Sequence, residues 1–95
     1  MQNSGLGNSI NTLASLMGYF RIPMVLLVSQ RGLGGETIGA QVPMGSVTEQ
    51  LLKVLDVPCF IYRRREDLVH LKDHVLHAKS QEKPVALLVH REFWE

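Results

Sequence analysis

A glycine-containing segment near the start of the chain has the residue types of a binding turn. Gly5 and Gly7 lie two residues apart in the run QNSGLGNSIN, just before a helical pattern. Glycine lets backbone amides approach a ligand closely because it has no Cβ, and the first N–H groups of a helix lack partners. We therefore expect a turn that lines a cofactor or an anion, built from Asn3, Ser4, Gly5, Leu6, Gly7 and Asn8.

The same spacing has a plainer explanation. It fits an ordinary strand-to-helix connection in which Asn8 or Ser9 caps the helix. A dinucleotide site is not indicated, because the third glycine and the downstream acidic residue of that motif are missing.

Arg31 is the charged residue best placed to bind an anion. It follows the apolar run Pro23–Ser29, and residues at the carboxyl ends of parallel strands face the ligand crevice. Its guanidinium suits a bidentate contact with a carboxylate, sulfonate or phosphonate. A solvated loop arginine explains the position equally well.

Gln41 begins an uncharged segment that ends at Gly45, inside a long loop from Gln30 to Gly45. Long loops in compact domains are often functional. The segment could contact substrate or act as a lid. It could equally be a hydrophobic staple around Ser46, which begins a predicted capping box with Glu49.

Three further groups of reactive residues have structural explanations. His70, His74 and His77 share one helix face at metal-ligand spacing, but a helical wheel places them outward and we predict no metal site. The basic turn at residues 63–65 is expected to be solvated. Cys59 is expected to be a buried, inert thiol because no histidine lies near it in the sequence.

The elements that position these residues alternate between helix and strand. Continuous apolar runs indicate strands covered on both faces, and alternation indicates a parallel sheet. The third helix should bury an apolar stripe made of Leu68, Val69, Leu71, Val75 and Leu76. We predict an α/β fold with helices at residues 8–20, 46–56 and 66–79 and strands at residues 23–29, 59–62 and 85–89.

Composition limits the possible functions. The chain has 95 residues, a hydrophobic content of 45% and a net charge of +1, which give no electrostatic reason to expect nucleic acid or a membrane as partner. Its longest apolar run is too short to span a bilayer. The single Cys59 cannot form an internal disulfide, in keeping with a reducing, cytoplasmic location.

These motifs together resemble one enzyme family. The resemblance is densest before Thr48, and the helices after Asp56 add little to it. The chain resembles the alpha subunits of sulfopyruvate decarboxylase, among the thiamine diphosphate-dependent 2-oxoacid decarboxylases, and less closely the phosphonopyruvate decarboxylases. The resemblance rests on residues 1–11, Ile22-Pro23, Ser29-Gln30-Arg31-Gly32, Gly35-Glu36, residues 40–45 and Thr48.

The resemblance implies a fold and a place in a larger assembly. Residues 1–95 would form one partial pyrimidine-binding domain, with a parallel sheet in three α/β/α layers that lacks its first strands. Met1 and Gln2 would be the end of the strand before the first helix. Because one edge of the strand at residues 23–29 and several apolar helix faces would be uncovered, we expect self-association or a partner.

The resemblance also implies a cofactor and a chemistry. Asn3 to Asn8 would flank the pyrimidine of thiamine diphosphate, and Arg31 and Gln41 would contact the substrate. The diphosphate and its magnesium would be held by a partner domain on a beta-type subunit. The family's cofactor-activating glutamate lies upstream of the Asn3 turn, so neither Glu36 nor Glu49 takes that role and we expect the chain alone to be inactive.

The resemblance leaves one departure and one alternative. The family more often has histidine at the position of Gln30, which puts a proton-transfer role there in doubt. The missing glutamate also motivates a non-catalytic alternative, in which the chain is a small α/β interaction module.

Overall fold

The computed structural model, which describes residues 1–95, has a parallel three-stranded sheet. The strands are β1 (Met24–Ser29), β2 (Cys59–Tyr62) and β3 (Pro84–Val89), in the spatial order β1-β3-β2. β3 pairs with β1 from Met24↔Pro84 to Ser29↔Val89, and with β2 from Cys59↔Ala86 to Tyr62↔Val89. The three predicted strands are therefore confirmed, with β1 and β3 differing by one residue at their starts.

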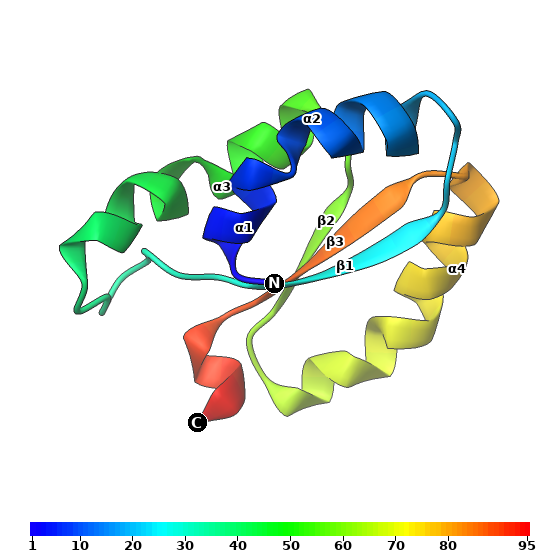
Figure 1. Ribbon diagram of the computed structural model, residues 1–95. Helices are drawn as coiled ribbons and strands as arrows, with labels where there is room; N and C mark the ends of the chain where they lie inside the picture. Colours follow the sequence, from blue (N-terminus) through cyan, green and yellow to red (C-terminus); the bar gives the residue numbers. More distant parts are fainter.

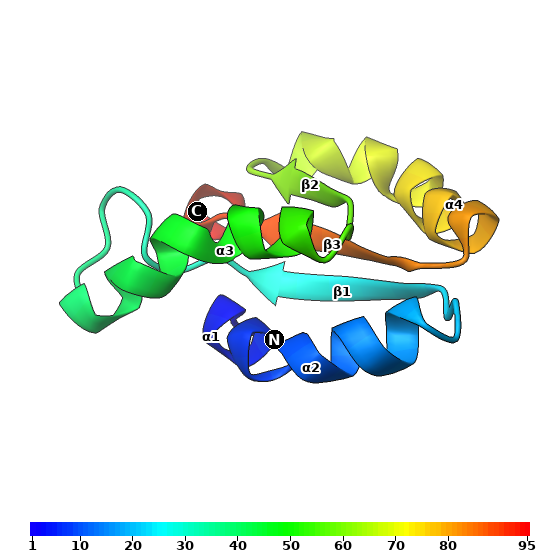
Figure 2. The same cartoon turned by 90° about the horizontal axis from the view of Figure 1, so that it is seen from above.

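Helices cover both faces of the sheet (Figures 1 and 2). One layer holds α1 (Asn3–Asn8), α2 (Ile10–Thr12) with its π-helical continuation (Leu13–Gly18), and α3 (Val42–Val54). The other holds α4 (Leu71–Gln81), which follows a 3-10 turn (Arg65–His70). This arrangement confirms the predicted three-layer α/β/α fold. None of the helices combines the length and apolar composition that crossing a bilayer would require.

The hydrophobic core is divided between the two faces. The α1/α3 face is the larger and mainly aliphatic, and the α4 face is smaller and partly aromatic. Every residue of the central strand β3 is buried, which explains why its sequence is continuously apolar. The first face buries Leu6, Leu13, Leu26, Val28, Leu52, Val57, Ala86 and Leu88; the second buries Tyr62, Leu87 and Val89 beside Phe60 and Phe93.

The predicted glycine turn is wrong, because the first helix begins at Asn3 and contains both glycines. The carbonyl of Gln2 accepts hydrogen bonds from the amides of Gly5 (2.9 Å) and Leu6 (3.2 Å). Tertiary burial of Leu6 outweighs the weak helix propensity of glycine. A Cβ on Gly7 would lie 3.3 Å from the Met44 side chain, so glycine instead permits close packing of α1 against α3.

The predicted start of the second helix is also wrong. α3 begins at Val42, after a 3-10 turn (Gly39–Gln41), rather than at Ser46. Ser46 is therefore inside the helix, where its hydroxyl donates to the carbonyl of Pro43 at 2.7 Å instead of capping an amide. Pro43 lies in the first turn, where its missing N–H costs nothing. Neither the capping box nor the hydrophobic staple around Ser46 forms.

The third helix presents a different face to the sheet from the predicted one. His74 stacks on Phe60, with ring centroids 3.8 Å apart, and its Nδ1 is 2.7 Å from the Tyr62 hydroxyl. The prediction that the histidines face outward holds for His70, which is exposed, and is wrong for His74 and His77, which are half-buried. The aromatic sheet surface with its phenol suits an imidazole better than an aliphatic chain. Of the predicted apolar stripe only Val75 is half-buried, whereas Leu68, Val69, Leu71 and Leu76 are exposed.

The first two residues run beside β1. The Ser29 amide donates to the Met1 carbonyl at 2.7 Å, and the Met1 amino group donates to the Leu27 carbonyl at 2.8 Å. Gln2 forms a parallel bridge with Ser29. This pairing agrees with the prediction that Met1 and Gln2 have strand character. The side of β1 that faces the α4 layer is poorly covered, because Leu27 keeps 57% of its surface exposed.

Candidate functional site

A cavity opens at the carboxyl edge of the sheet. Its volume is about 300 Å³, and it lies between the loop after β1 and the 3-10 turn (Arg91–Trp94) after β3. Ser29, Gln30 and Arg31 line one side, and His90 and Arg91 line the other. Because both strands point their carboxyl ends at it, the cavity occupies the usual ligand crevice of an α/β sheet.

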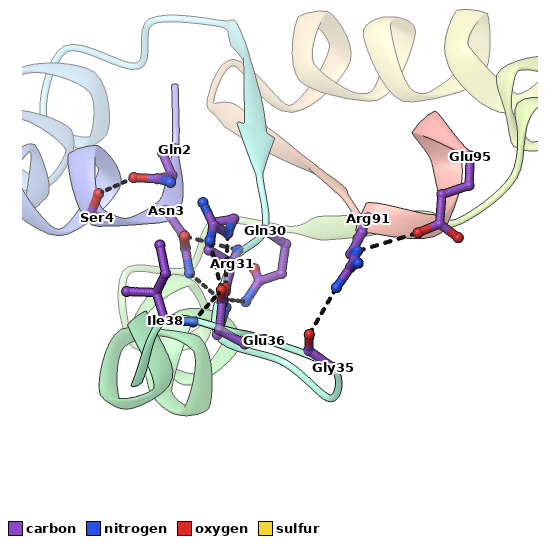
Figure 3. A network of polar contacts seen from close by, with 11 residues as sticks. Gln2, Asn3, Ser4, Gln30, Arg31, Gly35, Glu36, Ile38, Arg91 and Glu95 are labelled. Carbon is purple, nitrogen blue, oxygen red and sulfur yellow. Dashed lines mark hydrogen bonds and ion pairs between the residues drawn. The ribbon is translucent and has the colours of Figure 1, made fainter. Parts of the chain in front are cut away.

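Arg31 is held by an internal carboxylate in this cavity (Figure 3). Its Nε and Nη2 donate to the two carboxylate oxygens of Glu36 at 2.8 and 2.6 Å. The backbone amides of Gly32 and Ile38 donate to the same carboxylate at 2.9 and 3.1 Å. The Arg31 hydrogen bonds, followed by those from the two amides, lower the pKa of Glu36 to about 2. The pair therefore fixes the loop, and Arg31 keeps about a third of its side chain exposed.

Asn3 connects the start of α1 to the end of β1 and to α3. Its amide nitrogen donates to the Arg31 carbonyl and to the Thr48 hydroxyl oxygen, both at 3.0 Å, and its amide oxygen accepts from the Arg31 amide at 3.1 Å. Asn3 and Thr48 are both fully buried. The predicted ligand residue Asn3 thus uses its side chain to position Arg31, which the sequence could not show.

Two glycines allow the Arg31 loop to pack on α3. Gly32 has φ +85°, and a Cβ there would collide with the carbonyl of Gln41. A Cβ on Gly45 would collide with the carbonyl of Gly32. Both positions therefore require glycine for close backbone approach, and they set the distance between the cavity wall and α3.

The other residues of the predicted Asn3–Asn8 site differ in their access to a ligand. Leu6 is fully buried in the core, whereas Ser4 and Asn8 are exposed and Gly5 and Gly7 are partly exposed. Ser4 donates from its hydroxyl to Gln2 Oε1 at 2.8 Å. The segment carries no charge, and none of its residues lines the cavity.

Gln41 lies apart from the cavity. It is half-buried in the 3-10 turn before α3 and does not line the space that Arg31 lines. The structure therefore brings Arg31 to the crevice and leaves Gln41 behind the Arg31 loop, against Gly32.

Sequence reasoning missed His90 and Arg91. Both follow directly after β3 and line the cavity, and Arg91 Nη1 donates to the Gly35 carbonyl at 2.8 Å. The signal was available, because the strand-end rule that selected Arg31 applies equally to the residues after Val89. Their proximity to Arg31, however, depends on β3 lying next to β1.

The remaining candidates from the sequence are structural. No group of three or more histidine, cysteine, aspartate or glutamate side chains is arranged to hold a metal ion. Cys59 is half-buried, and burial raises the pKa of its thiol. In the basic turn, Asp67 accepts from the amides of Arg63 (2.8 Å) and Arg64 (3.0 Å), which holds the turn in place.

Comparison with known proteins finds relatives that are similar to this chain along its whole length. The chain is 42% identical to the sulfopyruvate decarboxylase subunit alpha of Methanococcus maripaludis and 44% identical to that of Methanothermobacter thermautotrophicus. The alignments cover 100% and 99% of this chain. The chain is related throughout to sulfopyruvate decarboxylase alpha subunits. Similarity extends to the helices after Asp56, where the sequence alone gave little indication.

Three facts qualify the comparison. The chain spans 58% of the length of these two relatives. A phosphonopyruvate decarboxylase of Streptomyces viridochromogenes is 40% identical, over 73% of this chain and 18% of that protein. No family model matches the sequence. The sulfopyruvate enzymes are thus similar over more of the chain than the phosphonopyruvate enzyme.

Proposed function

We propose that this chain forms part of a thiamine diphosphate-dependent 2-oxoacid decarboxylase that converts sulfopyruvate to sulfoacetaldehyde and carbon dioxide. The observation that supports it most strongly is the identity of 42–44% to alpha subunits of sulfopyruvate decarboxylase over essentially the whole chain. The parallel sheet with a cavity at its carboxyl edge is the architecture that such a site requires. In this proposal residues 1–95 are one partial pyrimidine-binding domain.

The cofactor in this proposal is shared with a partner. Thiamine diphosphate, when bound, supplies the electron sink that decarboxylation of a 2-oxoacid needs. The uncharged face of α1, with Ser4, Gly5, Gly7 and Asn8 accessible, would flank the cofactor's pyrimidine. In this proposal, as the resemblance implies, the diphosphate and its magnesium are held by a beta-type subunit, and the assembly is a cytoplasmic oligomer.

Asn3, Leu6 and the Arg31 loop would shape the substrate side of the site. Asn3 fixes the Arg31 backbone, and Leu6 anchors α1 in the core. Arg31 would attract the anionic head of the substrate while Glu36 keeps its guanidinium oriented. Gln41 would act from behind, by supporting the loop that closes over the substrate.

Reconstitution tests the proposed function directly. The chain is mixed with a sulfopyruvate decarboxylase beta subunit, thiamine diphosphate and magnesium, and carbon dioxide release is measured with sulfopyruvate and with phosphonopyruvate. We expect release from sulfopyruvate in the mixture and none from the chain alone. The Methanococcus maripaludis alpha subunit with the same beta subunit is the positive control. If the mixture with this chain releases no carbon dioxide while that control is active, the proposal is contradicted.

The alternative is a non-catalytic interaction module, an idea that the internally paired Arg31 and Asn3 support. Calorimetry separates the two. Under the alternative, the mixture with the beta subunit forms a complex whose affinity does not change when thiamine diphosphate is added. Under the proposed function, cofactor and subunit binding reinforce each other, because each completes the other's site.

A further inference from the structure

Gln30 and His90 are the deeply buried polar side chains of the cavity, with 5% and 7% of their surfaces exposed. They occupy equivalent positions at the ends of neighbouring strands. Ser29 pairs with Val89 in the sheet, and the Gln30 amide donates to the Val89 carbonyl at 2.9 Å. The two side chains therefore stand next to each other at the carboxyl edge, on strands far apart in the sequence.

Neither side chain has its hydrogen-bonding capacity filled by the protein. Gln30 Nε2 reaches the carbonyls of Arg31 and Gly45 at 3.3 and 3.5 Å, whereas its Oε1 is buried without a partner. His90 makes no side-chain hydrogen bond, and its ring nitrogens are not among the fully buried atoms that lack a partner. They consequently keep some exposed surface, on a residue that lines the cavity. Buried polar atoms without partners are rare in folded proteins, so Gln30 Oε1 beside this cavity requires an explanation, and the His90 ring nitrogens are free to bind a ligand.

The charges around His90 come from every neighbouring element. The pKa of its imidazole is lowered first by burial and then by Arg63 at the end of β2, while Glu92 and Glu49 act in the opposite direction. Arg31, on the other side of the cavity from His90, is neutralised by its neighbour Glu36. The imidazole is therefore mostly neutral at pH 7 and presents one N–H donor and one acceptor.

The cavity is small for a ligand site. Its volume of about 300 Å³ lies at the lower end of the range for small-molecule pockets. A molecule of a few carbon atoms with its oxygens fits this space, whereas a cofactor of the size of thiamine diphosphate does not. Two arginines, Arg31 and Arg91, and two glutamates, Glu36 and Glu92, line the cavity. Arg31 is paired with Glu36, and Arg91 with Glu95, so the anionic character of the ligand follows from the proposed substrate rather than from the charge of the lining.

We propose that His90 is a substrate-binding residue of this site, whose ring N–H holds an oxygen of a small anionic 2-oxoacid. This inference rests on the proposed function and adds a residue from the third strand to it. An anion next to the imidazole stabilises the imidazolium, so binding takes up a proton. Substrate should therefore bind more tightly at about pH 5.5–6 than at about pH 8, because this range spans the usual histidine pKa near 6.5.

Steady-state kinetics of the reconstituted enzyme test this role. In His90→Phe, which keeps a ring of similar size, we expect KM for sulfopyruvate to rise roughly tenfold with kcat within about twofold, the pattern of lost ground-state binding. In His90→Gln, which keeps a donor but cannot titrate, KM should return toward the original value and lose its dependence on pH. His77→Phe, on the opposite layer, is the matched control. An unchanged KM and pH profile in both His90 variants, with a native unfolding temperature, would overturn the inference.

A second measurement separates this inference from the proposed function. The His90 ring signals of the full chain are followed by NMR while sulfopyruvate is added without thiamine diphosphate. A saturable shift of His90, with a raised pKa and no change at His77, supports the site even if reconstituted decarboxylation fails. Unchanged His90 signals at millimolar sulfopyruvate would reject it even if decarboxylation succeeds.

Discussion

The two faces of the sheet are held in different ways. On the α1/α3 face, aliphatic side chains form a closed core, and Asn3, Thr48 and the two tight glycines fix the backbones at contact distance. On the α4 face, contact depends on an imidazole that stacks on Phe60 and meets Tyr62, and Leu27 of β1 stays largely exposed. Close backbone packing therefore lies behind the cavity, and looser packing lies on the opposite face.

This difference suggests separate roles for the two faces: one positions the cavity residues, and the other is where we test binding to a partner. The closely packed face supports Arg31 and His90, since small movements of α3 would displace the loop that carries the cavity wall. Exposed apolar side chains occur on both sides of the sheet: Tyr19, Phe20 and Val54 on the α1/α3 side, and Leu27 and Val69 on the α4 side. Leu27 belongs to the sheet itself, and exposed apolar patches often mark interfaces. Each of the following changes tests one part of this contrast.

Gly45→Ala should have the largest effect on stability. Its Cβ would collide with the Gly32 backbone, which no side-chain rotation can relieve. We expect a loss of about 3 kcal/mol in the free energy of unfolding, the upper part of the range for overpacking. Urea denaturation measures it. Gly39→Ala is the control, because nothing lies within 4 Å of a Cβ there, and an equal loss in both variants would contradict the close-packing argument.

Asn3→Ala should have the next largest effect, a loss of about 2 kcal/mol in the free energy of unfolding. The change leaves the buried Thr48 hydroxyl and the Arg31 amide without their partner, and an unsatisfied buried polar group costs on the order of 1–3 kcal/mol. Asn8→Ala, at an exposed position on the same helix, should change stability little. Thermal unfolding compares the two. Equal stability of both variants would show that the Asn3 contacts do not hold α1 to the Arg31 loop.

His74 should make the α4 face sensitive to acid. Burial, followed by the nearby His70, lowers the pKa of the folded-state imidazole below its usual 6.5. The unfolded chain then binds more protons, so stability is full above about pH 6.5 and falls as the pH drops through the folded-state pKa. His74→Gln should flatten this slope in unfolding measurements between roughly pH 8 and pH 5. His90→Gln, on the other face, should leave the His74 contribution intact; an unaltered slope in His74→Gln would refute the role.

Leu27→Ser should have the smallest effect on the isolated fold. Its side chain is mostly exposed, so the free energy of unfolding should change by about 0.5 kcal/mol or less. If this surface binds a second copy or a partner, the change should reduce association, as measured by light scattering or by binding of the beta subunit. Lys72→Ser on α4 is a control at an exposed polar position. If Leu27→Ser leaves association unchanged, the exposed surface of β1 is not part of the interface.

The sequence predicted strands better than helix starts. The runs at residues 24–29, 59–62 and 84–89 are short and mostly apolar, which is typical of strands. Only β3 is buried along its whole length, whereas alternate residues of β1 are exposed. Helix starts were misplaced because local signals competed with packing. Ser46 has the residue type of a cap, but the helix begins at Val42, with Pro43 in its first turn and Gly45 packed against Gly32.

The site was predicted in part. Strand-end reasoning identified Arg31, which the structure places in the cavity. It did not reveal that Glu36 and Asn3 hold Arg31, because both contacts depend on how the loop folds back. It also could not rank Gln41 against His90, since that depends on which strand neighbours β1.

The amino-acid sequence by itself determined the α/β class and the strands, because periodicity is a local property of the chain. Its local motifs also determined the similarity to sulfopyruvate decarboxylase alpha subunits. Only the tertiary structure decided that β3 lies between β1 and β2, which places Gln30 beside His90. It also decided which side of α4 faces the sheet, through stacking of His74 on Phe60. Contacts between residues distant in sequence are set by the packing of whole elements, and no local pattern encodes them.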